Sequence, residues 1–261
     1  MTTILYHPVH QTAEANQKAS IKGEDQSDLL HPLTLPGYYI EPVPYIEYAK
    51  EEHKDYKYYN DPSWRHYWEN TYVVFNQKDI TFRWDKTTGE VFDTSFDIKN
   101  AQDFVFVQQG GLANLPKVGD QFKGVLVIQW NESLMCWPKK PNKNLWIEVI
   151  PYPDMHHNTG MELIGCDFPL GRWYRAINGA YACYKTEINV VRGTPLYMIR
   201  FRGGKDNVYK LERSRDIKPP HKVRQLFRVS QALKTWLPKK SWGFIKDDVE
   251  EKKCPFNFLF K

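Results

Sequence analysis

The stretch YPDMHHNTGMELIGCDF, residues 152–168, gathers side chains that could do chemistry: Asp154, His156, His157, Glu162, Cys166 and Asp167. Imidazole, carboxylate and thiolate groups are the ligands that bind zinc and iron, so the stretch is either a metal site or a polar loop between two strands. His156 and His157 are adjacent, and adjacent side chains of an extended strand point to opposite faces. We therefore predict a loop and no metal, with His156, His157 and Asp167 as the alternative ligand set.

Other catalytic patterns are missing from the sequence. It contains neither HxH nor HExxH, and its only HxD, at residues 53–55, precedes the β-rich region, whereas jelly-roll oxygenases carry that motif on a strand. The GxSxG, GxxxxGK[ST] and strand-associated GxGxxG patterns are absent too. Asp154 with Glu162 or Asp167 could serve as an acid–base pair, but carboxylates in loops are usually solvated. We predict no catalytic residue and no cofactor.

Positive charge is concentrated in one segment. Residues 202–228 hold nine Lys or Arg and three Asp or Glu, a local +6, whereas the whole chain carries +5. Lysine and arginine neutralise phosphates and aromatic rings stack on bases, so this segment is a candidate nucleic-acid surface, although a solvated helix face is the simpler explanation. We expect weak, non-specific nucleic-acid contact at most, through Lys205, Lys210, Arg213, Arg215, Arg224 and Arg228.

The two ends of the chain differ in pattern from its middle. Residues 1–44 are polar and then proline-punctuated, with no sustained period, which predicts an extended N-terminal arm. After Asp61 and Pro62, the spacing of Trp64, Tyr67 and Trp68 predicts a short helix with an aromatic face. An amphipathic helix follows Pro220, so residues 219–261 are predicted to be a helix and tail that pack on the core.

Residues 45–218 are predicted to form the core domain. They contain at least seven β-type runs between Gly, Pro and Asn breaks, namely TYVVF, ITFRW, VFDTSFDI, FKGVLVIQW, LWIEVI, MELIGCDF, YACYKTEINVV and PLYMIRF. This pattern is typical of a mainly β protein, and we predict an antiparallel β-sandwich or a jelly-roll-like domain.

Composition limits the compartment. Four cysteines without a CxxC pair indicate reduced thiols, and no apolar run approaches the roughly 20 residues that span a bilayer. No secretory leader is recognisable either. We therefore expect a soluble, cytoplasmic protein that contacts no membrane.

Within residues 124–201 the order of motifs resembles an uncharacterised family of bacterial and phage proteins, known only as a domain of unknown function. That family carries W-x-x-x-x-P, then E-[GL]-[LI]-x-x-D, then a closing strand with G-x-P. The matching residues here are Trp146, Pro151, Glu162, Leu163, Ile164, Asp167, Gly193 and Pro195. Where the family has an aromatic-Thr-Met-Asn-Trp run, this chain has YRAINGAYACYK. The resemblance implies no activity, and it gives the matching stretch a structural meaning, in which Gly160 and Gly165 flank a strand and polar residues lie at its ends.

These observations favour a non-enzymatic β-sandwich protein, phage-encoded and virion-associated if the resemblance holds, that acts as an assembly or binding module. A protein partner or self-association is expected, because assembled subunits use aromatic surfaces, long N-terminal arms and short apolar C-terminal tails to reach their neighbours. The alternative is a jelly-roll enzyme such as an iron- and 2-oxoglutarate-dependent oxygenase. The candidate binding residues are Trp146, Glu162, Asp167, Trp173 and Arg175.

Overall fold

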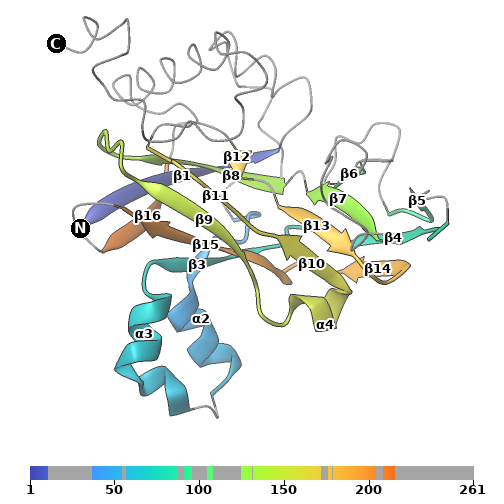
Figure 1. Cartoon of the computed structure of the whole chain (residues 1–261), viewed down its shortest axis with the longest axis horizontal. Helices are drawn as coiled ribbons and strands as arrows, with labels where there is room; N and C mark the ends of the chain where they lie inside the picture. Colours follow the sequence, from blue (N-terminus) through green and yellow to red (C-terminus); the bar gives the residue numbers. More distant parts are fainter. Residues whose placement is uncertain are drawn as a thin grey trace, which may run out of the picture.

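The protein is mainly β, as Figure 1 shows for the computed structural model. The structure describes residues 1–10, 37–54, 57–87, 91–95, 105–107, 125–130, 132–171, 176–177, 179–203 and 208–214. Among the described strands every pairing is antiparallel except that of the first strand with the last. The prediction of a mainly β chain is confirmed, with several small, mostly antiparallel sheets and few short helices among the described residues. Of the described helices, none is long and apolar enough to cross a membrane.

Two larger sheets make up one end of the molecule. One of them, the β1 sheet, has four strands in the order β12-β8-β1-β16. It is formed by β1 (Thr2–His10), β8 (Glu132–Pro138), β12 (Ala176–Ile177) and β16 (Tyr209–Arg213). The five-stranded sheet has the order β11-β9-β15-β3-β2, formed by β2 (Val43–Pro44), β3 (Thr71–Phe75), β9 (Trp146–Pro151), β11 (Cys166–Phe168) and β15 (Pro195–Arg202).

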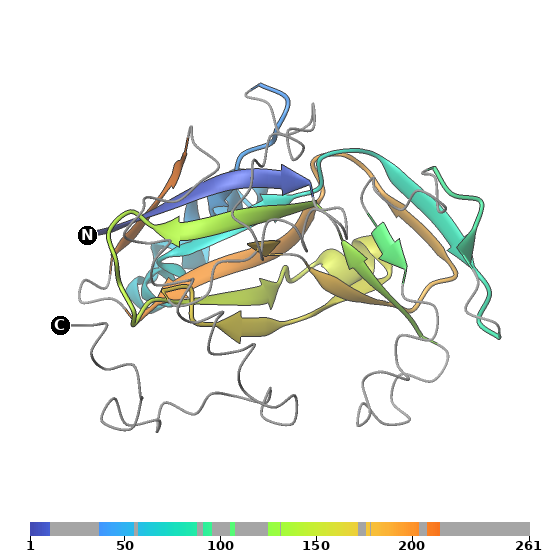
Figure 2. The same ribbon diagram turned by 90° about the horizontal axis from the view of Figure 1, so that it is seen from above.

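Two smaller sheets lie at the other end, where β4, β5 and β14 project away from the rest (Figure 2). One has the order β10-β13-β7-β6, formed by β6 (Val105–Val107), β7 (Leu126–Trp130), β10 (Met161–Ile164) and β13 (Ala180–Cys183). The other has the order β14-β4-β5, formed by β4 (Ile80–Trp84), β5 (Val91–Phe92) and β14 (Glu187–Val190).

A single buried cluster receives side chains from all four sheets. Phe201 of β15 connects two of these sheets within the cluster. Its ring centroid lies 6.0 Å from that of Tyr72 in β3, in the same sheet, and 6.2 Å from that of Tyr209 in β16, in another. Burial of this apolar surface is the main favourable term in folding. The four sheets therefore share one core.

Alternation of apolar and polar residues explains the best-predicted strands. In β4, Ile80, Phe82 and Trp84 are buried and the residues between them are exposed, as a period of two requires. All five residues of β3 are buried because α2 (Tyr45–Glu52) covers its second face, where the ring of Tyr48 contacts that of Phe75.

The first ten residues differ from the predicted arm. Strand β1 lies between β8 and β16, and its Ile4 and Tyr6 belong to the core. Pro8 argues against an interior strand, since proline cannot donate to a ladder. Here the β16 pairing ends at Tyr6, so at Pro8 the strand is paired only with β8.

Two helices lie beneath the five-stranded sheet, on the side away from β1 and β8 (Figure 1). The predicted aromatic-faced helix is confirmed as α3 (Pro62–Trp68), which follows the 3-10 turn η3 (Lys57–Asn60). Asp61 caps it by accepting hydrogen bonds from the backbone N–H groups of Ser63 at 2.7 Å and Trp64 at 3.0 Å. The preceding helix, α2, was not expected from the sequence.

Two of the predicted runs each form two strands. MELIGCDF divides at Gly165 into β10 and β11, which pair in different sheets, and YACYKTEINVV divides at Lys185 into β13 and β14. Of the cysteines in the described ranges, Cys136 and Cys183 are buried and Cys166 is exposed. The predicted C-terminal helix and tail, and most of the predicted arm, lie outside the described residues.

Candidate binding groove

The histidine-rich stretch contains a short helix, α4 (Met155–Thr159), in place of the expected loop. It ends at Gly160, whose φ of 73° is the left-handed conformation that glycine adopts most easily. The Lys185 stem lies over Gly160, and the Lys185 ammonium donates to the His157 carbonyl at 3.4 Å. A cation at a helix C-terminus is stabilising. Lys185 thus holds α4 beside the start of β14.

The alternative metal ligands are not assembled. His156 and His157 are exposed on α4 with ring centroids 6.1 Å apart, and the His156 ring lies against Tyr184. Asp167 belongs to β11 of the five-stranded sheet and is bonded to Arg202. In the described part of the chain, no three His, Cys, Asp or Glu side chains are grouped to hold a metal ion.

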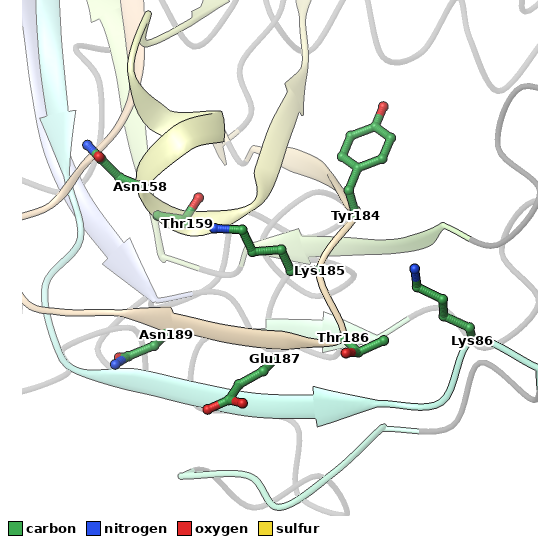
Figure 3. A pocket seen from close by; sticks show the side chains of 8 residues that line it. All are labelled: Lys86, Asn158, Thr159, Tyr184, Lys185, Thr186, Glu187 and Asn189. Carbon is green, nitrogen blue, oxygen red and sulfur yellow. The ribbon is translucent and has the colours of Figure 1, made fainter.

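An open hollow of about 580 Å³ lies between α4 and β14 (Figure 3). Its lining is polar and comprises Lys86, Asn158, Thr159, Tyr184, Lys185, Thr186, Glu187 and Asn189. Amide and hydroxyl side chains can both donate and accept hydrogen bonds. With two lysines and one glutamate, the hollow has a net positive charge.

A second hollow, of about 410 Å³, adjoins the first, since Asn158, Thr159 and Asn189 line both. The rest of its lining is Tyr48, Glu52, His53, Tyr152, Asp154, Val191, Thr194 and Pro195. We call the two hollows together the groove. It runs from Lys86 at one end, past α4, to the C-terminus of α2 at the other.

Two tyrosines give the second hollow an aromatic side. The rings of Tyr48 and Tyr152 are 6.1 Å apart and nearly perpendicular, and their hydroxyls are hydrogen-bond partners. Burial raises the pKa of both phenols above the ordinary value, and the negative charges of Glu52 and Asp154 raise the pKa of Tyr48 further. Both phenols are therefore neutral at physiological pH, and Glu52 and Asp154 supply the negative charge of this hollow.

The structure brings together two of the predicted binding residues, Trp146 and Asp167, through Arg202. The Arg202 guanidinium lies 2.6 Å from Asp167 Oδ2, 2.8 Å from Glu148 Oε1 and 5.6 Å from the Trp146 ring centroid. Arg200 is 2.7 Å from Glu148 and 5.2 Å from the Tyr67 ring. These side chains form a ladder across β11, β9 and β15, in which each described charge has an opposite partner.

Glu162 does not belong to this ladder. It lies on β10 and accepts a hydrogen bond from the Tyr184 hydroxyl at 3.0 Å, next to the first hollow. Trp173 and Arg175, the other predicted binding residues, lie outside the described residues.

Only two of the predicted nucleic-acid contacts lie in the part of the chain that the structure describes, and both are ion-paired. Lys210 Nζ is 2.9 Å from Glu212, which also faces Lys139 at 3.6 Å. Arg213 pairs with Glu41, which accepts a hydrogen bond from the Tyr6 hydroxyl as well. Pairing reduces the positive charge that these side chains offer to a phosphate. Lys205, Arg215, Arg224 and Arg228 lie outside the described ranges.

No known protein family matches the chain, and no curated protein is similar to it. The resemblance across residues 124–201 therefore stays a prediction.

Sequence reasoning missed most of the groove. Asp154 entered the sequence analysis as an acid–base partner of Glu162 or Asp167, whereas Tyr48, Glu52, Lys86 and Tyr152 did not enter it as site residues. These residues come from α2, the turn after β4 and the turn before α4, and no spacing in the sequence links them. The sequence does contain a pattern that could have predicted the ladder. In IEV and IRFR, charged and apolar residues alternate with the period of a strand, which places the charged side chains on one face.

Proposed function

We propose that this protein is a non-enzymatic binding module that holds an extended, polar segment of a protein partner in the groove. The observation that carries the proposal is that the two hollows adjoin, with Asn158, Thr159 and Asn189 lining both, and differ in charge. Lysines line one end, and Glu52 and Asp154 line the other.

A peptide segment suits these dimensions and this chemistry. An extended chain advances about 3.3–3.6 Å per residue, so a few residues reach from one hollow into the next. The amide side chains of Asn158 and Asn189 at the junction can donate to peptide carbonyls and accept from peptide N–H groups. Opposite charges at the two ends of a groove fix the register of a bound segment.

The finer fold and the biological setting belong to the same proposal. A β-sandwich is supported by the single core that joins the sheet containing β1 to the five-stranded sheet. A phage-encoded origin, a virion-associated location and a partner that is another structural subunit rest on the family resemblance alone. No observation among the described residues favours the oxygenase alternative.

Selection from a displayed library of random twelve-residue peptides on the immobilised full chain tests the proposal. We expect enriched peptides, and we expect Asn158→Trp, which fills the junction, to weaken their binding about tenfold or more in calorimetric titration, equal to about 1.4 kcal/mol. The matched control is His157→Trp, because His157 is an exposed neighbour on α4 whose side chain lines neither hollow. Failure to enrich any peptide, or equal binding by Asn158→Trp and the parent protein, would show that the groove is not the site.

A further inference from the structure

We infer that the second hollow is a subsite for a cationic group, the ammonium or guanidinium of a lysine or arginine side chain in the bound segment. This inference rests on the proposed function, since it names what one end of the groove recognises. Four side chains carry it: the rings of Tyr48 and Tyr152, and the carboxylates of Glu52 and Asp154.

The ionisable lining of the hollow comprises two carboxylates, Glu52 and Asp154, and one imidazole, His53, besides its two tyrosines. Glu52 and Asp154 lie on opposite sides of it, one at the end of α2 and one just before α4, and the electrostatic influence of both reaches the Tyr48 hydroxyl. Of the described residues that line the hollow, none is lysine or arginine. A cation bound in the hollow would lie close to both carboxylates, and opposite charges near a protein surface attract each other.

The aromatic side of the hollow favours a cation over a neutral polar group. A ring face attracts an ammonium or guanidinium through its quadrupole, and the attraction grows as the ion loses water. Tyr152 is buried and Tyr48 half-buried, so the side chain of a ligand would contact rings that are already partly desolvated. The methylene stem of lysine or arginine would meanwhile cover Val191 and Pro195 at the same opening.

Asp154 can be altered without removing a helix cap. It occupies the N-cap position of α4, but its side chain makes no capping hydrogen bond. Glu52 is the last residue of α2 and is exposed. Glu52→Gln with Asp154→Asn therefore removes the charge and keeps the shape. Glu51→Gln is the matched control, because Glu51 neighbours Glu52 but does not line the groove.

The test uses Nα-acetyl-lysine N-methylamide as the probe, so it does not require the partner. In NMR titrations of the full chain, we expect this probe to shift the ring signals of Tyr48 and Tyr152, and its norleucine counterpart to shift them at least about tenfold less strongly at equal concentration. The response should disappear in the Glu52→Gln/Asp154→Asn variant, persist in Glu51→Gln, and weaken as salt is added.

Equal shifts with the norleucine probe, or lysine shifts that survive the double substitution, would overturn the cation subsite. The failure of the proposed function is distinguishable, because it is read from the peptide selection and from Asn158→Trp. Selected peptides that lack a basic residue would leave the groove as a binding site and contradict only the cation subsite.

Discussion

Deletion of residues 2–8 is expected to abolish the cooperative unfolding transition. These residues form most of β1, which pairs with β16 from Thr2 to Tyr6 and with β8 from Ile4 onwards. Without β1, β16 loses its pairing to the sheet and β8 keeps only its short pairing with β12, and the core side chains of Ile4 and Tyr6 are lost as well. Burial of one large apolar side chain contributes about 1.5–3 kcal/mol, against a typical domain stability of about 5–15 kcal/mol.

Thermal unfolding followed by circular dichroism measures this effect. The shortened chain should melt without a sharp transition or accumulate as insoluble protein, whereas a detachable arm could be removed with little change. A transition as sharp and as high in temperature as that of the full chain would contradict the place of β1 in the sheet.

The second large effect is expected from Phe201→Ala, which should lower the free energy of unfolding by about 3–5 kcal/mol. Phe201 is 2% exposed and contacts Tyr72 of its own sheet and Tyr209 of β16, in the sheet that contains β1. Truncation therefore leaves a cavity where the two larger sheets meet. Chemical denaturation at equilibrium measures the loss.

The next residue along β15 supplies the control for this prediction. Arg202 points to the opposite face, where its ion pairs with Glu148 and Asp167 are half-exposed. Exposed ion pairs contribute little, so Arg202→Ala should cost about 1 kcal/mol or less. If both variants lost the same stability, the assignment of the two faces of β15 would be wrong.

The strands that the sequence predicts well are those whose burial follows a simple period. Ile80, Phe82 and Trp84 alternate with polar residues, and TYVVF is rich in β-branched and aromatic side chains. The interior position of β1 was missed because Pro8 is a local signal against a central strand, and the partner strands lie more than a hundred residues away. The position of β1 depends on pairing with these distant strands, and local sequence propensity carries no information about that pairing.

The helix α2 was missed for a related reason. It is only eight residues long, which is shorter than an isolated helix needs to be stable in water, and no side chain caps its N-terminus. Packing of Tyr48 against Phe75 and Tyr152 holds it on the sheet. Since the second hollow is built partly from this helix, the candidate site was out of reach of sequence reasoning as well.

The central claim is that a partner segment occupies the groove, and NMR mapping of a selected peptide tests it most directly. On addition of the peptide, the side-chain amide signals of Asn158 and Asn189 should shift most, because both residues line both hollows. The indole signal of Trp146 should stay unchanged, because Trp146 lies beside Arg202 in the ladder across β11, β9 and β15 and lines neither hollow. Shifts that cluster at Trp146 while Asn158 and Asn189 stay unchanged would place binding on the ladder and contradict the account.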